Sequence, residues 1–286
     1  MTHNWWSGRD SGPIRGSLDY TRASVAGINA DWDLFQRVHR QNAFLGDFSP
    51  AERLSPGMRA SLLAAADSII ERYRNNSDPA VQDFDWPKAA ACLRHALEID
   101  RNDREAQGKL ALSNGYVNLV RASSDSATEH RVLLDAAQEN FEEAVSLIPR
   151  SPDPHLGLAR IYIYSRKNIG KAMAELHEAE RLGFQPGPRE LEEEADGYRF
   201  RASSELSEAR KYGQKSRMLA QRYLRLAQRD FERSRQLYEP ILGFSNVSVA
   251  LRQVDDDDRA REQLDDSLKK PPKRQRKAYG RVGRWQ

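Results

Sequence analysis

Apolar and small residues recur every three or four positions along most of the chain, which is the period of an amphipathic α-helix. Five segments repeat a small residue, a bulky apolar residue four positions later and a small residue three positions further on. They are Ala89–Leu93–Ala96, Ala137–Phe141–Ala144, Ala172–Leu176–Ala179, Ala227–Phe231–Ser234 and Ala260–Leu264–Ser267. Steps of four and three place such residues on one helix face. We therefore predict helices that pack through faces of alternating small and large side chains.

Runs of alternating β-branched residues, which would indicate strands, are absent, whereas strong helix formers dominate the chain. Capping signals are predicted at Ser55-Pro56, Ser151-Pro152, Asp85 and the box Ser126–Glu129. Gly213 is expected to bend or divide the longest helical segment. The expected helices cover residues 31–43, 55–74, 86–100, 104–122, 127–148, 152–166, 169–182, 188–204, 205–238, 246–254 and 258–268.

One repeat is defined most clearly between residues 137 and 162. The series Ala137-x3-Phe141-x2-Ala144-x4-Pro149 is similar to the second helix of a tetratricopeptide repeat, and Leu158-Ala159-x2-Tyr162 resembles the first helix of the next repeat. The resemblance covers residues 85–182 well and residues 188–268 weakly. Two features depart from the family pattern: Arg101 stands where proline is usual, and the spacing from Leu110 to Ala137 is long.

The resemblance implies an all-α fold, an α-α superhelix of antiparallel helical hairpins. A hairpin of this kind leaves an apolar face exposed unless it stacks on its neighbours. We expect a flexible leader at residues 1–30, an irregular N-terminal helical cap at residues 31–84, and the repeats at residues 85–268. Residues 269–286 are expected to be a disordered basic tail.

Charge is unevenly distributed along the chain. The net charge is only +3, from 45 basic and 42 acidic residues, but eight of the basic residues and none of the acidic ones lie in residues 269–286. The remainder of the chain therefore has 37 basic and 42 acidic residues and is mildly acidic. Short basic clusters of this kind bind nucleic acids or anionic surfaces, or fold back onto an acidic body.

Sequence signatures of catalysis are missing. The chain has no glycine-rich phosphate loop and no His-Glu-x2-His pair, and its six histidines do not lie at metal-ligand spacing from one another. Its single cysteine, Cys92, is expected to be a buried, inert thiol. We therefore expect a non-enzymatic protein with no cofactor and no metal site, although catalytic groups from distant helices can converge without leaving a motif.

The resemblance implies that the first helix of each hairpin lines a concave groove that holds an extended peptide or a partner helix. Leu158, Ala159 and Tyr162 align the sequence with the first helix of the family's hairpin, and Ala195 and Tyr198 do so more weakly. This alignment indicates which residues would face the groove. The expected partner-binding residues are Arg160, Ile163, Tyr164, Asp196, Arg199 and Phe200. An arginine fork suits a partner carboxylate, and tyrosine adds a stiff contact with a polar tip. The alternative is that the aromatic side chains only pack between hairpins.

A second hypothesis is binding to nucleic acid or to an anionic surface. Four arginines of the segment 205–238 fall within an arc of about 80° at helical spacing. The residues expected to carry this alternative function are Arg222, Arg225, Arg229, Arg233, Lys273, Arg274, Arg276 and Lys277. A charged stripe is also what an amphipathic surface helix presents to water, so both interpretations stay open.

The sequence has no apolar run long enough for a membrane span, and its first residues do not read as a signal peptide. We therefore expect a cytoplasmic protein with no membrane span, whose partner is a protein or peptide. The chain is also compatible with an accessory region of a larger assembly, and its oligomeric state is not indicated.

Overall fold

The computed structural model describes residues 19–42, 44, 50–76, 85–123, 127–244 and 246–269, and these form helices and turns with no strand. The predicted all-α class is therefore confirmed for the described part of the chain. The chain divides into two compact units, residues 1–197 and residues 198–286. The predicted basic tail, apart from Lys269, lies outside the described residues.

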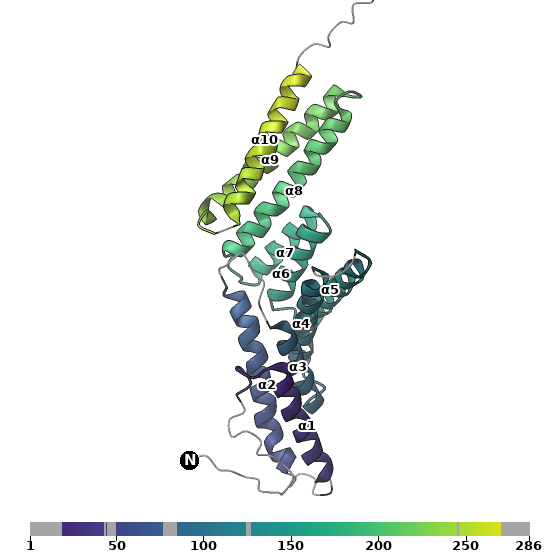
Figure 1. The fold of residues 1–286 in the computed structure, drawn as a ribbon, viewed down its shortest axis with the longest axis vertical. Coiled ribbons are helices and arrows are strands. Elements are labelled where there is room, and N and C mark those ends of the chain that lie inside the picture. Colours follow the sequence, from purple (N-terminus) through teal and green to yellow (C-terminus); the bar gives the residue numbers. More distant parts are fainter. Residues whose placement is uncertain are drawn as a thin grey trace, which may run out of the picture. The chain divides into compact units, whose positions relative to one another are not determined.

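Unit 1 is built from consecutive helices that pack against their neighbours in chain order. α2 contacts α3, α3 contacts α4, α4 contacts α5, α5 contacts α6 and α6 contacts α7 (Figure 1). The elements are α1 (Val25–Gln41), α2 (Pro50–Arg74), α3 (Trp86–Ile99), α4 (Arg104–Ala122), α5 (Ala127–Leu147), α6 (Asp153–Arg160), the π-helical turn η2 (Ile161–Ser165) and α7 (Ile169–Arg181). The first part of α8 (Pro188–Tyr212) completes the unit.

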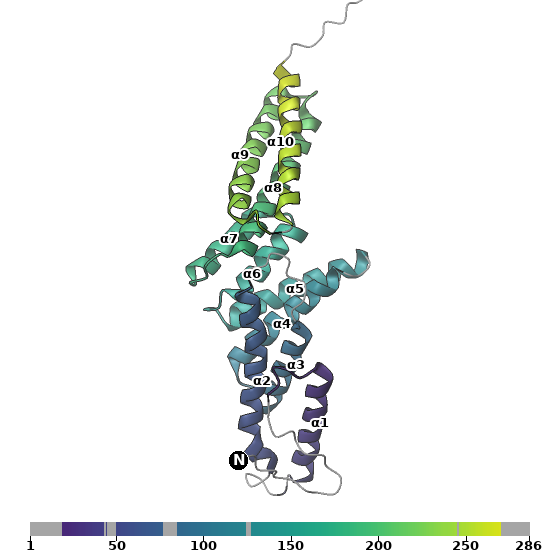
Figure 2. The same ribbon diagram turned by 60° about the vertical axis from the view of Figure 1, so that its left-hand side comes forward.

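Unit 2 consists of the second part of α8 together with α9 (Arg217–Tyr238), the short 3-10 turn η3 (Glu239–Ile241) and α10 (Val247–Lys269). α9 and α10 run side by side (Figure 2). Leu206 and Ala209 of α8 and Leu224 of α9 form its buried apolar cluster, against which Leu264 and Leu268 of α10 pack.

The small–large–small faces are the packed faces, as predicted. The first four of the five series are buried throughout, and the fifth is only partly buried at the end of α10. Phe141 shows why the spacing works. A Cβ atom placed at Gly115 of α4 or at Gly157 of α6 would lie 2.6 Å from its Cε1 atom. The ring therefore fills a slot that exists because both neighbouring helices carry glycine there.

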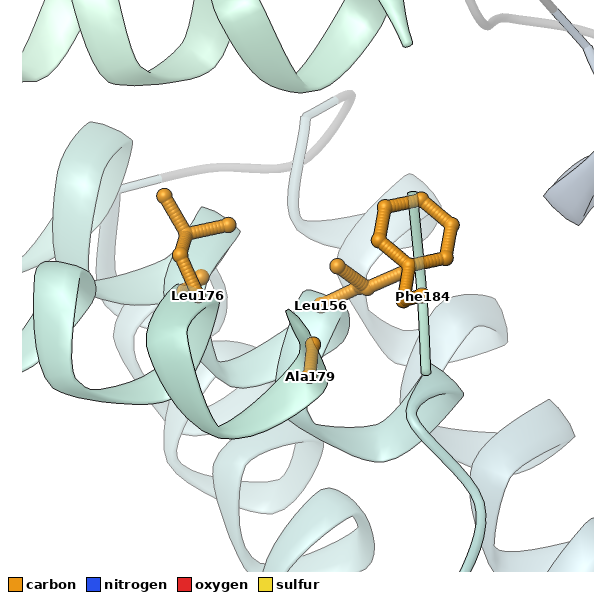
Figure 3. Close-up of a cluster of buried hydrophobic side chains, with 5 residues drawn as sticks. Leu156, Leu176, Ala179 and Phe184 are labelled. Carbon is orange, nitrogen blue, oxygen red and sulfur yellow. The ribbon is translucent and has the colours of Figure 1, made fainter. Parts of the chain in front are cut away.

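The helix pair α6 and α7 has a core of Leu156, Ala159, Leu176, Ala179 and Phe184 (Figure 3). Phe184, the last of these side chains, lies in the turn that follows α7. Gly183 has a φ of +95°, and the backbone N–H of Phe184 bonds the carbonyl of Ala179 at 3.0 Å. This left-handed turn closes the helix and directs Phe184 back onto the face formed by Leu176 and Ala179.

Several predicted boundaries are wrong. α1 begins at Val25 rather than residue 31, because Ser24 caps it by accepting a hydrogen bond from the Gly27 N–H at 3.1 Å. α2 begins at Pro50, so Ser55 and Pro56 lie inside the helix and not at its start. Asp85 does cap α3, accepting from the Lys88 N–H at 3.2 Å. The predicted capping box begins at Ser126, which lies outside the described residues.

Three further differences concern the second half of the chain. α6 begins at Asp153 with Pro152 at the N-cap position, and the predicted capping residue Ser151, one position earlier, accepts a hydrogen bond from the Asp153 N–H at 3.4 Å. The expected break between residues 204 and 205 does not occur, and the chain instead turns after Tyr212, at the position of Gly213. α10 runs without interruption through the acidic run at residues 255–258.

Candidate functional site

Three of the predicted partner-binding residues form contacts between helices of unit 1. Arg160, at the end of α6, makes an ion pair with Glu193 of α8. The Tyr164 hydroxyl donates a hydrogen bond to Asp196 Oδ2 at 2.9 Å, and the guanidinium carbon of Arg160 lies 5.3 Å from the centre of the Tyr164 ring. These side chains join the π-helical turn to α8, so their polar groups are already used within the protein.

Burial determines the electrostatics of this contact. It raises the pKa of Glu193, although the neighbouring guanidinium of Arg160 acts in the opposite direction. It also raises the pKa of Tyr164 well above the usual phenol value, and the carboxylate of Asp196 adds to that effect. Glu193 is only 4% exposed, which makes Arg160 its necessary counter-charge.

The other predicted partner-binding residues are placed differently. Ile163 is 1% exposed and its side chain packs inside unit 1. Arg199 and Phe200 belong to unit 2. There Arg199 Nη1 donates to Gln253 Oε1 at 2.7 Å, and the guanidinium carbon lies 4.5 Å from the centre of the Phe200 ring.

An arginine is buried among aromatic rings at the start of α8. Arg189 is 1% exposed, and its guanidinium carbon lies 4.2 Å from the centre of the Tyr73 ring. Its Nη1 atom donates a hydrogen bond to the Tyr73 carbonyl at 2.7 Å. Its Nε atom donates to Glu190 Oε1 at 2.6 Å. Trp86 stacks on Tyr116 with ring centres 4.2 Å apart, and Tyr73 is tilted against both rings. This cluster joins α2, α3, α4 and α8 and has a structural role.

A pocket of about 640 Å³ opens on the surface of unit 1 between α2, α4 and the turn from α5 to α6. Its apolar lining comes from Ile70, Leu112, Leu147 and Ile148, together with two prolines of the turn. Gly108 shapes the site, because a Cβ atom there would lie 2.6 Å from Ile148 Cγ2. The turn can therefore approach α4 closely. Charged residues surround the lining: Asp67, Glu71, Arg74, Glu105, Lys109, Arg150 and Asp153.

Most charges of this pocket are paired with one another. Lys109 Nζ lies 2.8 Å from Asp67 Oδ1 and 2.7 Å from Glu105 Oε1. Arg74 holds Asp153 through two hydrogen bonds, of which the one from Nε measures 2.8 Å. Glu71 and Arg150 are exposed and make no ion pair with any described residue. The pocket thus offers an apolar surface bordered by one available charge of each sign.

The arginine stripe is placed as the sequence indicated. Arg222, Arg225, Arg229 and Arg233 all lie exposed on α9. The guanidinium carbon of Arg233 lies 6.0 Å from the centre of the Tyr198 ring. The four tail residues of the same hypothesis, Lys273, Arg274, Arg276 and Lys277, lie outside the described residues.

Cys92 is fully buried, and burial raises the pKa of its thiol to about 11. Among the residues that the structure describes, no three or more His, Cys, Asp and Glu side chains are grouped so that they could hold a metal ion. No helix in the described part of the chain combines the length and apolar character needed to cross a membrane.

Comparison with known proteins gives no relative: no family model, no curated protein and no solved structure matches the chain. The function must therefore be argued from the geometry.

The pocket of unit 1 is absent from the sequence prediction. Its lining comes from three segments, at residues 67–74, 105–112 and 147–153, and no periodicity links them. Two signals were present in the sequence. Gly108 interrupts a run of residues that favour helix strongly. Pro149 and Pro152 restrict the backbone of the turn from α5 to α6.

Proposed function

We propose that this chain is a non-catalytic protein-interaction scaffold of tetratricopeptide-like helical hairpins, and that its pocket in unit 1 binds an extended peptide segment of a partner. The observation that carries the proposal is the pocket of about 640 Å³, with its apolar lining and two unpaired rim charges. Pockets of a few hundred cubic ångströms, mostly apolar with a few placed polar groups, are typical ligand sites.

The hairpin packing supports the scaffold part of the proposal. Successive helices of unit 1 contact one another in chain order, and the small–large–small faces lie between them. Helical-repeat proteins of this kind provide extended binding surfaces. The predicted groove residues Arg160, Tyr164 and Asp196 already bond within the protein, so the binding role passes to the pocket.

The rim charges suggest what the peptide carries. An apolar side chain would enter between Ile70 and Ile148, while Glu71 and Arg150 would each meet an opposite charge on the peptide. The other carboxylates that line the pocket are held by Lys109 and Arg74. Their pairing supports a binding role in preference to acid–base chemistry.

The test uses a displayed library of random twelve-residue peptides selected on the full-length protein. Selected peptides are synthesised with a fluorescent label, and their Kd is measured by anisotropy. The double variant Glu71→Lys/Arg150→Glu exchanges the two rim charges without changing the net charge. We expect it to weaken binding about tenfold or more.

The matched control is Arg121→Glu/Glu139→Lys, which exchanges two exposed charges on α4 and α5 that do not line the pocket. It should leave the Kd within about twofold of the parent value. If no peptide is enriched, or if the selected peptides bind the rim variant as tightly as the parent protein, the proposed pocket function is wrong.

A further inference from the structure

Unit 2 carries a row of exposed arginines that form no ion pair among the described residues. Arg222, Arg225 and Arg229 are exposed on α9 and make no ion pair with any described residue. At 1.5 Å per residue, the stripe from Arg222 to Arg233 extends about 16 Å along one side of the helix. It is a continuous strip of positive charge on a rigid element.

Three other arginines of the same helix bundle have acidic partners. Arg201 of α8 binds Asp230, Arg235 of α9 lies 3.0 Å from Asp255, and Arg261 of α10 binds Asp258. Acidic partners are therefore available in this unit, but Arg222, Arg225 and Arg229 make no ion pair with any described residue. Arg229 comes nearest to an exception, because it lies close enough to Glu205 to lower that group's pKa slightly.

The two units have opposite charge. By sequence, residues 1–197 contain 23 basic and 30 acidic residues, whereas residues 198–286 contain 22 basic and 12 acidic residues. Unit 2 therefore has a net charge of +10 and unit 1 a net charge of −7. Seven of these 22 basic residues lie at residues 270–286, outside the described residues, so residues 198–269 have a net charge of +3.

We propose that the face of α9 formed by Arg222, Arg225 and Arg229 binds the phosphate backbone of nucleic acid without reading its sequence. A guanidinium offers a planar fork of donors that matches two phosphate oxygens, and it is always charged. Contacts of this kind neutralise phosphates and release counterions, which gives affinity without base specificity.

Two other polyanionic surfaces fit the structure less well. A helix that binds a lipid surface inserts an apolar face, but the apolar face of α9 is buried: Leu224 is 2% exposed and Phe231 is fully buried. Among the described residues of α9, Met218, at 80% exposure, is the large apolar side chain exposed beside the stripe. An acidic partner helix would need an apolar seam for a stable interface, and the stripe does not provide one.

The experiment measures binding of a labelled 20-nucleotide single strand and a labelled 20-base-pair duplex by anisotropy over a series of salt concentrations. The full-length stripe variant Arg222→Ala/Arg225→Ala/Arg229→Ala is compared with the parent. We expect the variant to bind the duplex at least tenfold more weakly at low salt. The slope of log affinity against log salt should become less steep by about 2–3, since each phosphate contact contributes about 0.9.

A matched control removes the same charge elsewhere. Arg37→Ala/Arg94→Ala/Arg121→Ala takes three exposed helical arginines from unit 1, none of which makes an ion pair within the described chain. It should bind within about twofold of the parent, because these arginines lie away from the stripe. Far-ultraviolet circular dichroism checks that both triple variants melt like the parent.

A third full-length variant, Lys273→Gln/Arg274→Gln/Arg276→Gln/Lys277→Gln, separates the stripe from the tail. The proposal is overturned if the parent binds neither nucleic acid at low salt. It is also overturned if the stripe and control variants lose affinity equally, or if only the tail variant loses it. Binding to vesicles of anionic phospholipid with no binding to either oligonucleotide would assign the surface to membranes instead. None of these results depends on the pocket of unit 1.

Discussion

Phe141 of α5 is in such close contact with Gly157 of α6 that even a methyl group at position 157 has no room. A Cβ atom there would lie 2.6 Å from Phe141 Cε1 and 2.7 Å from Cζ. The ring cannot move aside easily, because Phe141 is fully buried and has Gly115 on α4 as a second close neighbour. The packing of three consecutive helices thus depends on two glycines and one aromatic ring.

This relationship predicts that Gly157→Ala destabilises the protein, although alanine is normally the better helix residue. We expect a loss of about 1–3 kcal/mol in the free energy of unfolding, measured by urea denaturation, from overpacking of the buried ring. Gly170→Ala, at the start of α7, is the matched control, since its nearest neighbouring atom would be 3.7 Å away. The control should be neutral or slightly stabilising. Equal effects of the two substitutions would contradict the packing argument.

The ion pair between Arg160 and Glu193 predicts that removing the arginine alone destabilises the protein more than removing both charges. Arg160→Met leaves the carboxylate of Glu193 buried without its guanidinium, and we expect a loss of about 2–4 kcal/mol in the free energy of unfolding. Adding Glu193→Gln to this variant should restore part of the loss. Arg181→Met removes the partner of Glu178 at an exposed site and should leave Tm almost unchanged. A double variant less stable than Arg160→Met would count against a charge effect.

Glu205 of α8 predicts that the stability of unit 2 depends on pH. Burial, followed by the nearby carboxylate of Asp230, raises its pKa to about 7, and its Oε2 atom is buried with no hydrogen-bond partner among the described residues. The folded state therefore holds this proton more tightly than the unfolded chain does. Its contribution to stability is complete below the ordinary pKa of 4.5 and is lost as the pH rises to about 7.

The variant Glu205→Gln cannot ionise, so it should avoid this loss. Its Tm relative to the parent should be higher at about pH 8 than at about pH 5. Glu232→Gln, an exposed residue on α9, serves as the control and should show no such change with pH. If the difference between Glu205→Gln and the parent is the same at both pH values, Glu205 does not titrate in this range.

Cys92 should be unreactive in the folded protein. Its side chain is fully buried and burial raises its pKa to about 11, so both access and thiolate formation are prevented. A thiol reagent such as 5,5′-dithiobis(2-nitrobenzoic acid) should therefore react only at the rate of unfolding at neutral pH. Fast reaction under native conditions would show that α3 opens readily.

Much of the fold follows from local pattern. The small–large–small faces identified the packed sides of α3, α5, α7 and α9, because side chains at steps of four and three must share a helix face. Gly213 marked the end of α8, because a glycine within a helical pattern is a local signal for a bend or a break. The spacing of the four arginines also gave the exposed side of α9 correctly.

The errors have tertiary causes. α2 continues back through Pro56 to Pro50, where Ala51 is fully buried and helps to hold the extra turns. α10 passes through four consecutive aspartates, and Arg235 of the neighbouring helix α9 lies 3.0 Å from the first of them, Asp255. Sequence spacing contains neither fact, since it shows only which residues share a helix and not which helices meet.

The candidate sites also differ in whether they lie on one helix or need several helices to meet. Arg160 and Tyr164 were selected for their groove-facing register, but the structure uses both for contacts with α8. The pocket of unit 1 depends on segments up to about 80 residues apart, so a local pattern cannot reveal it. The arginine stripe needs only one helix and was therefore visible in the sequence.

The opposite charges of the two units make the overall isoelectric point of 8.9 a poor description of the molecule. We expect a chain with this uneven charge to adhere to both anion- and cation-exchange resins at neutral pH. We also expect its copies to attract one another in dilute buffer. Purification and storage therefore call for moderate salt, which screens this attraction over distances of about 10 Å.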